Sequence, residues 1–285
     1  MASMPRLLPL AALALLTCAT LSSSAQNPPA PTPIPITIAP QPAQPKPEDA
    51  IAALHAAMDA LLQQRGEHRQ FLYTLEMDET YSTPDGQTIG KESRKFENLF
   101  IAGKPYARLI EKDGKPLSKK EAAEEEKKYN KALESHNSYT TSQHFAHTVH
   151  GVDYDLRDVQ SSYTLRYVGW QVIDGRRLWR IDAFPPPPSG AKPVHQVKVT
   201  FWLDEQTKNI VRDDSTLYKD DDQLLLGSRD SEEFIQVEGV YCITHLSSHL
   251  VLKEGHVIDS DHIYTNYKKF NSTIKILPGS EVVDP

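Results

Sequence analysis

The sequence is poor in cysteine. Of its 285 residues only Cys18 and Cys242 are cysteines. If Cys18 is removed with an export signal, Cys242 is the single thiol left, and no disulfide can form within the chain. We therefore expect a fold that is held together by its core without covalent cross-links.

A long uninterrupted apolar run is also missing. The stretch Leu7–Leu21 is broken by Pro9 and by polar residues, whereas a membrane-spanning helix needs about 20 apolar residues. Arg6 precedes this stretch and Ser23-Ser24-Ala25 follows it, which is the pattern of a secretory signal peptide. We expect residues 1–25 to be cleaved off after Ala25, leaving a periplasmic protein.

Cys18 leaves a second possibility open. Leu15-Leu16-Thr17-Cys18 approximates a bacterial lipobox, in which a lipid is attached to the cysteine, although Thr17 stands where Gly, Ala or Ser is usual. Lipidation at Cys18 would tether the protein to the outer membrane.

The chain has no excess of basic residues. Its 31 Lys and Arg stand against 38 Asp and Glu, a net charge of −7, and removal of residues 1–25, with one Arg and no acid, makes it −8. This balance argues against nucleic acid or an anionic membrane surface as a partner.

Catalytic motifs are missing as well. The sequence contains neither a Gly-x-Ser-x-Gly elbow nor a His-Glu-x-x-His motif, and Gly86–Lys91 is one residue short of a phosphate-binding loop. Cys242 lies within a predicted strand, where a buried and inert thiol is the usual case. We therefore predict no enzymatic activity, no catalytic residues and no cofactor.

Three histidines leave a metal-binding alternative open. His144, His147 and His150 recur at every third residue, and neutral imidazole is a good ligand for zinc or copper. No cysteine or carboxylate flanks them at the usual ligand spacing, so solvated or capping histidines are the favoured explanation of the pattern. We assign no metal ligand.

Proline marks the organisation of the chain. Nine of the 21 prolines lie between Gln26 and Pro47, a composition that favours an extended polyproline spacer. We expect a signal peptide at 1–25, a Pro-rich linker at 26–46 and one domain at 47–285. That domain opens with a helix that begins at Pro47 and ends near Gly66, because Ile51, Leu54, Met58 and Leu61 form one apolar stripe.

Strands dominate the rest of the domain. Short turns such as Asp174-Gly175 link most of them, which favours antiparallel pairing. In the sixth predicted strand Val197, Val199, Phe201 and Leu203 share one face. The predicted strands are Phe71–Tyr81, Thr88–Ile101, Pro105–Glu111, Tyr163–Ile173, Arg177–Phe184, Val194–Leu203, Ile210–Tyr218, Val240–Leu252 and Val257–Phe270.

A charged helix interrupts the strands. Ser118 and Glu121 form a capping box ahead of Ala122–Leu133. We expect a surface helix laid over the sheet, or alternatively a polar lid over the mouth of a cavity.

The predicted fold class is α+β. About ten antiparallel strands with two helices can form a strongly curved sheet, an incomplete β-barrel with helices covering its concave side. A two-layer sandwich is the alternative. If the concave side encloses a cavity, we expect Trp170, Trp179, Phe201 and Trp202 to line it, although these residues could equally fill the core.

One hairpin carries a resemblance to a known family. Phe201-Trp202-Leu203-Asp204-Glu205-Gln206-Thr207-Lys208-Asn209-Ile210-Val211-Arg212 is an aromatic strand ending in Asp, a turn with Thr, and a strand with a basic residue. It resembles the central hairpin of the LolA/LolB-like envelope proteins. The resemblance implies an incomplete β-barrel plugged by helices, whose interior receives acyl chains of lipoproteins or serves in envelope stress sensing.

These observations favour a non-catalytic periplasmic carrier, monomeric, that binds a lipid or a lipidated protein in an apolar cavity. One alternative is an envelope protein-interaction or stress-sensing module, tethered by the Pro-rich spacer, with a protein partner. The other is a metal-binding protein that uses the histidines above.

Overall fold

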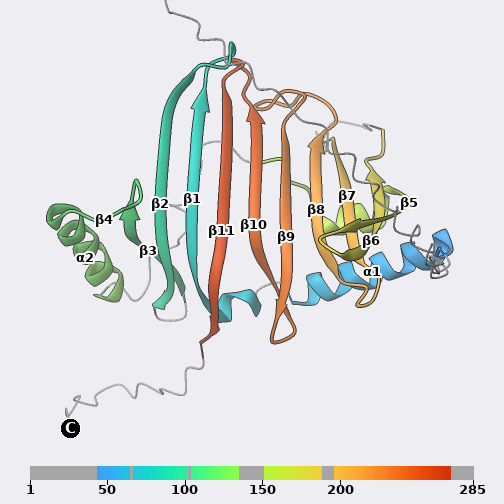
Figure 1. Cartoon of the computed structure of the whole chain (residues 1–285), viewed down its shortest axis with the longest axis horizontal. Helices are drawn as coiled ribbons and strands as arrows, with labels where there is room; N and C mark the ends of the chain where they lie inside the picture. The colour runs from blue at the N-terminus through green and yellow to red at the C-terminus, as the bar shows by residue number, and fades with distance from the viewer. Residues whose placement is uncertain (1–43, 65–66, 102–103, 135–150, 188–195, 271–285) are drawn as a thin grey trace, which may run out of the picture. The chain divides into compact units, whose positions relative to one another are not determined.

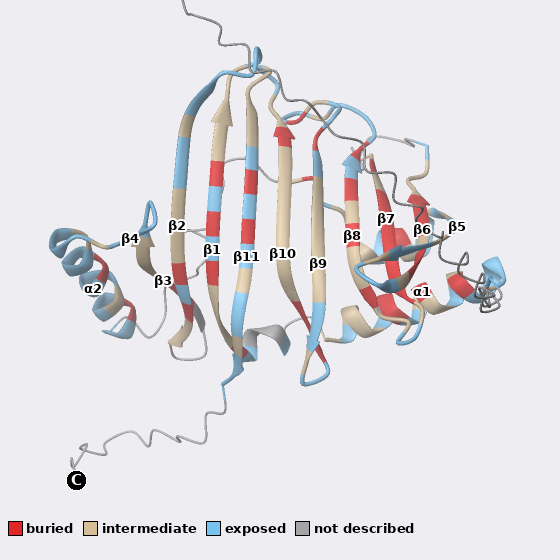
Figure 2. Ribbon diagram, viewed as in Figure 1, coloured by how far each residue is buried: buried red, intermediate tan, exposed pale blue. Residues whose placement is uncertain are grey.

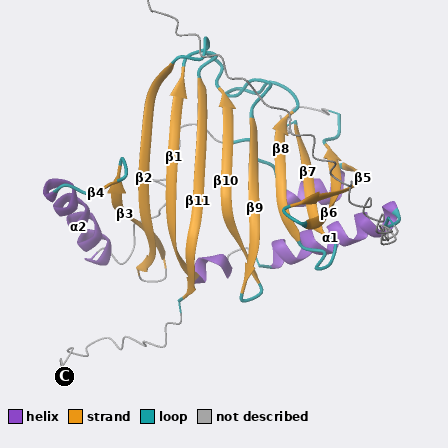
Figure 3. Ribbon diagram, viewed as in Figure 1, coloured by secondary structure: helices purple, strands orange, loops and turns teal. Residues whose placement is uncertain are grey.

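The computed structural model of the chain describes residues 44–64, 67–101, 104–134, 151–187 and 196–270. The predicted signal peptide, Cys18, almost all of the Pro-rich linker and the three histidines at 144, 147 and 150 lie outside these ranges. The described residues form one antiparallel sheet, three α-helices and a short 3-10 helix at Glu67–Gln70 (Figures 1 and 3).

Eleven strands make up the sheet, in the spatial order β4-β3-β2-β1-β11-β10-β9-β8-β7-β6-β5. The strands are β1 (Phe71–Ser82), β2 (Thr88–Ile101), β3 (Lys104–Lys112), β4 (Lys115–Pro116), β5 (Thr164–Ile173), β6 (Arg176–Phe184), β7 (Val197–Asp204), β8 (Ile210–Leu217), β9 (Arg229–Val237), β10 (Val240–Val251) and β11 (Val257–Lys269). All pairs are antiparallel, and the curved sheet stays open, with β4 and β5 at its two edges. The predicted fold class is therefore confirmed.

Two meanders form this sheet. The first runs from β1 to β4 and the second from β5 to β11, so nearly every strand pairs with its neighbour in sequence. The exception is the pairing of β1 with β11, which runs from Phe71 opposite Lys269 to Ser82 opposite Val257. This long-range pairing joins the two meanders into one sheet.

The helix α1 (Pro47–Gln63) covers one face of the second meander. Proline in the first turn and the acids Glu48 and Asp49 suit the start of a helix. Leu54 and Met58, four residues apart, are fully buried, and the helix contacts β5, β6 and β8. Burying each of these two side chains stabilises the fold by about 1.5–3 kcal/mol. The face that α1 covers is called the inner face below, and the opposite one the outer face.

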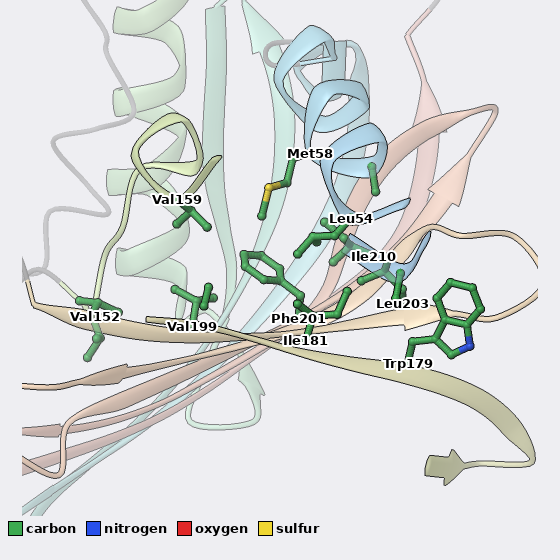
Figure 4. Close-up of a cluster of buried hydrophobic side chains, with 14 of the residues drawn as sticks. Leu54, Met58, Val152, Val159, Trp179, Ile181, Val199, Phe201, Leu203 and Ile210 are labelled. Atoms are coloured by element: carbon green, nitrogen blue, oxygen red, sulfur yellow. The ribbon is translucent and has the colours of Figure 1, made fainter. Parts of the chain in front are cut away.

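The main hydrophobic core lies between α1 and the inner face. Val197, Val199, Phe201 and Leu203 all belong to it, as the alternation in the sequence predicts. Figure 4 shows Leu54 and Met58 above Phe201, Ile181 and Leu203. The seven-residue helix α3 (Leu156–Ser162), which the sequence patterns did not predict, adds the fully buried Val159. Buried residues accordingly concentrate on β6 to β8, with further groups on β1 and β11 (Figure 2).

The charged helix α2 (Lys119–Glu134) packs against β3, near the sheet edge away from α1 (Figure 1). Its predicted capping box is confirmed: the Ser118 amide donates to Glu121 Oε2 at 2.9 Å, and the Glu121 amide donates to Ser118 Oγ at 3.3 Å. The buried Glu125 carboxylate accepts a hydrogen bond from the Tyr106 hydroxyl at 3.0 Å. Helix α2 is thus anchored to β3. None of its residues lines the cavity on the inner face.

Candidate ligand-binding cavity

A cavity of about 430 Å³ lies on the inner face, beside the main core. Its walls are the end of α1, the segment that leads into α3, and residues of β1, β8, β9, β10 and β11. This volume lies within the range of small-molecule sites, which is about 300–1,000 Å³. Among the described residues the aliphatic part of the lining consists of Leu61, Leu62, Val152, Leu156 and Ile243.

Aromatic rings extend this apolar wall. Phe234 and five tyrosines line the cavity, and the ring of Tyr73 lies 5.7 Å from that of Tyr264 and 5.3 Å from that of Tyr267 between centroids. Burial raises the pKa of both Tyr264 and Tyr267 well above the ordinary value of 10.0, so these phenols stay neutral. The tyrosines therefore offer a ligand ring surface together with a few hydroxyl groups.

Cys242 is part of this wall. Its side chain is buried, and burial raises the pKa of the thiol to about 11. Because the thiolate is the nucleophilic form, Cys242 is inert at neutral pH. The thiol thus acts as a small apolar group in the lining.

Three carboxylates form a different part of the lining. Asp213 on β8 is paired with Glu232 on β9, and Ser215 is paired with Asp230. Paired residues of antiparallel strands point to the same face, about 5 Å apart at Cβ. Asp213, Asp230 and Glu232 consequently gather at one place on the inner face, and all three line the cavity.

Hydrogen bonds hold the segment before α3 against these strands. The Tyr154 hydroxyl donates to Asp213 Oδ2 at 2.8 Å, the Val152 amide donates to Asp230 Oδ2 at 2.6 Å, and Ser215 Oγ donates to the Val152 carbonyl at 2.9 Å. The other oxygen of Asp230, Oδ1, is buried, and a hydrogen bond from the side chain of Ser248, opposite Asp230 on β10, partly offsets the effect of burial on the pKa of this carboxylate. Asp230 is thus bonded from two sides, by the Val152 amide and by Ser248.

Burial raises the pKa of all three carboxylates, and the charges of neighbouring acids add to this effect. Burial is the main cause for Asp213, whose pKa lies well above the ordinary 3.8, and the charge of Glu232 adds to it. Burial, followed by the charges of Asp230 and Asp153, raises the pKa of Glu232 from 4.5 to about 7. Burial likewise raises the pKa of Asp230. Glu232 is therefore only partly ionised at neutral pH, and no Arg, Lys or His occurs among the described residues of the lining.

The four aromatic residues predicted to line a cavity lie elsewhere. Trp179 and Phe201 are buried in the main core, and Trp170 packs half-buried against it with the Arg177 guanidinium 4.2 Å from its ring. Trp202 lies on the outer face, where its Nε1 donates to Asp214 Oδ2 at 2.7 Å. None of the four is among the residues that line the cavity above, and a ligand contact by any of them stays a prediction.

The part of the chain that the structure describes contains no candidate metal-binding site. No group of three or more His, Cys, Asp or Glu side chains there could hold a metal ion, the three carboxylates of the cavity included. His144, His147 and His150 lie outside the described residues. Among the described helices, none is long and apolar enough to cross a membrane.

Comparisons with known proteins give structural neighbours only. No protein-family model matches the chain, and no curated protein matches it. A LolA superfamily protein from Nitrosomonas europaea is 14% identical with a TM-score of 0.33, covering 75% of this chain and 93% of its own. A DUF1329 family protein from Desulfovibrio piger is 13% identical with a TM-score of 0.35, covering 76% and 93%. A domain from Vibrio parahaemolyticus described as an outer membrane lipoprotein-sorting protein is 8% identical with a TM-score of 0.37, covering 77% and 94%. All three TM-scores are below 0.5, so the fold stated above rests on this chain's own strands and helices.

Proposed function

We propose that this protein is a non-catalytic carrier of the cell envelope that binds a lipid, or the acyl chain of a lipidated protein, in the inner-face cavity. The observation that supports this proposal is the cavity itself, about 430 Å³ in volume and walled by aliphatic side chains, Phe234 and tyrosine rings. The signal peptide predicted at residues 1–25 agrees with a periplasmic location.

Apolar burial supplies the binding energy in this proposal. Each methylene group transferred from water into the cavity contributes about 0.8 kcal/mol, so a chain of ten buried carbons gives useful affinity without any reaction. The inert thiol of Cys242 and the neutral phenols agree with binding rather than catalysis. A carrier needs such reversible, non-covalent affinity.

A titration with the neutral fluorophore Nile red tests the proposal. Delipidated protein should bind one molecule of the dye with increased fluorescence, and a long-chain alcohol should displace it. Replacing Leu62 with Trp adds a large ring to the cavity wall and should weaken dye binding about tenfold or more. Leu226→Trp, the same substitution at an exposed loop position, is the matched control. Dye binding that is absent, or that Leu62→Trp leaves unchanged, would count against the proposal.

A further inference from the structure

We propose that the cavity selects amphiphiles whose polar end is a cationic amine, which Asp213, Asp230 and Glu232 would hold while the apolar wall takes the tail. This inference rests on the function proposed above, because it names the class of ligand for the same cavity. It distinguishes this cavity from one built for fatty acids or phosphates, whose polar ends are anionic.

The charge of the lining carries the inference. Four acids line the cavity, namely Asp153, Asp213, Asp230 and Glu232, and no basic side chain occurs among its described residues. Buried charges are normally paired, since an unpaired charge in an apolar environment is costly. An ammonium group would supply the missing counter-charge, whereas a carboxylate or phosphate would add repulsion.

Unused hydrogen-bonding capacity points in the same direction. Within the described ranges, no hydrogen bond or ion pair reaches the carboxylate of Glu232, which lies in the lining and is largely buried. An ammonium group has three N–H donors and no acceptor, which matches an ionised carboxylate, whose oxygens only accept. Hydrogen bonds between such charged groups are about twice as strong as neutral ones.

The acids and the apolar wall lie on different strands, so they would contact opposite ends of an amphiphile. Asp213 and Glu232 face each other across β8 and β9, and Asp230 lies two residues before Glu232 on the same face. The apolar wall that surrounds Cys242, with Ile243 and Tyr267, is built instead by β10 and β11. A head bound at β8 and β9 would thus have an apolar surface beside it for the tail.

Binding of an amine is coupled to proton release. The pKa of Glu232 is about 7, so this carboxyl is partly protonated at neutral pH, and an ammonium ion favours its ionised form. The other titratable groups in the lining are Asp153, Cys242 and tyrosines, none of which carries a positive charge. Amine affinity should therefore rise between pH 5 and pH 8, and the affinity for a carboxylate of equal length should fall.

Three 12-carbon ligands with different heads test the inference: dodecylamine, 1-dodecanol and dodecanoate. Each competes with Nile red at pH 8, at a concentration where it stays monomeric. We expect dodecylamine to bind about tenfold more tightly than 1-dodecanol, and dodecanoate to bind more weakly than both. A dodecylamine affinity equal to or below that of the alcohol would overturn the inference.

Matched variants separate the site from the overall negative charge of the protein. Glu232→Gln should lower dodecylamine affinity about threefold to tenfold and leave 1-dodecanol within about twofold. Glu254→Gln removes the same charge from an exposed turn and should change neither. Equal effects of the two variants would contradict a built amine site.

The two proposals fail in different ways. If Nile red and 1-dodecanol bind but dodecylamine has no advantage, the cavity binds apolar tails without selecting an amine, and only this inference is wrong. If neither the dye nor the alcohol binds, the carrier function itself is wrong.

Discussion

Replacing Glu232 with Gln should make the folded protein more stable at pH 8 and leave its stability at pH 4 nearly unchanged. The pKa of Glu232 is 4.5 in an ordinary environment and about 7 in the folded chain, because the side chain is largely buried and lies near Asp230 and Asp153. Between these two pH values the folded state binds more protons than the unfolded state. Stability is therefore lost as pH rises through this window and stays reduced above it.

The magnitude follows from the two pKa values. Each pKa unit corresponds to about 1.4 kcal/mol, so ionised Glu232 opposes folding by up to about 3 kcal/mol at pH 8. Gln carries no charge at any pH and has nearly the same shape. Part of the gain is offset because the buried amide needs hydrogen-bond partners of its own, so the expected stabilisation at pH 8 is about 1–3 kcal/mol.

Urea unfolding followed by tryptophan fluorescence measures this effect. Wild type, Glu232→Gln and the exposed control Glu254→Gln are unfolded at pH 4 and at pH 8, and the free energies of unfolding are compared. We expect only Glu232→Gln to gain stability at pH 8. Unfolding curves of Glu232→Gln that coincide with wild type at both pH values would contradict the raised pKa of this carboxylate.

Three further predictions concern other parts of the fold. On the outer face, burial alone would raise the pKa of Asp182, but hydrogen bonds from Lys198, Arg180 and Thr200 outweigh it and lower the pKa. Asp182→Asn should therefore lower the free energy of unfolding, measured with urea near pH 7, by about 3 kcal/mol. This contribution exists above the ordinary pKa of 3.8 and is lost as pH falls through the lowered value, so wild type and variant should converge in stability at low pH. Phe201→Ala leaves a void in the main core and should lower the free energy of unfolding, measured in the same way, by about 3–5 kcal/mol. A loss below about 1 kcal/mol would be inconsistent with full burial of Phe201. Tyr154→Phe removes the hydrogen bond to Asp213 and should speed hydrogen exchange around residue 154, while unchanged exchange would show that this bond does not hold the segment.

Local patterns predicted much of the fold. The Asp174-Gly175 turn is a clear case, because both residues have positive φ angles, 49° and 75°, as a two-residue hairpin turn of this kind requires. The capping box at Ser118 and the alternation in β7 were equally informative. In each of these cases the deciding interaction lies within a few residues along the chain, or follows directly from the period of the strand.

The cavity depends on contacts that no local pattern contains. Strand β9 was missed because its inward residues include Asp230 and Glu232, so the apolar alternation that indicates a strand is absent. Asp213 meets Glu232 only through the register of β8 with β9. The acid site could not be predicted before that register was known.

Strand geometry alone assigns two of the predicted aromatic residues to opposite faces of the sheet. Consecutive residues of a strand point to opposite faces, so Phe201 and Trp202 cannot line the same face of β7. The structure places Phe201 in the core on the inner face and Trp202 beside Asp214 on the outer face. Strand parity alone separates this pair, whereas the choice between core and cavity for Trp179 depends on where α1 lies.

Photo-crosslinking tests most directly whether the inner-face cavity receives an apolar tail. A long-chain alcohol with a photoreactive diazirine near the end of its chain is bound, irradiated, and located by peptide mass spectrometry. We expect labels on cavity residues such as Leu62, Phe234 and Tyr264, and dodecylamine should suppress this labelling. Labels confined to exposed outer residues such as Ile263, or labelling that Leu62→Trp does not reduce, would contradict it.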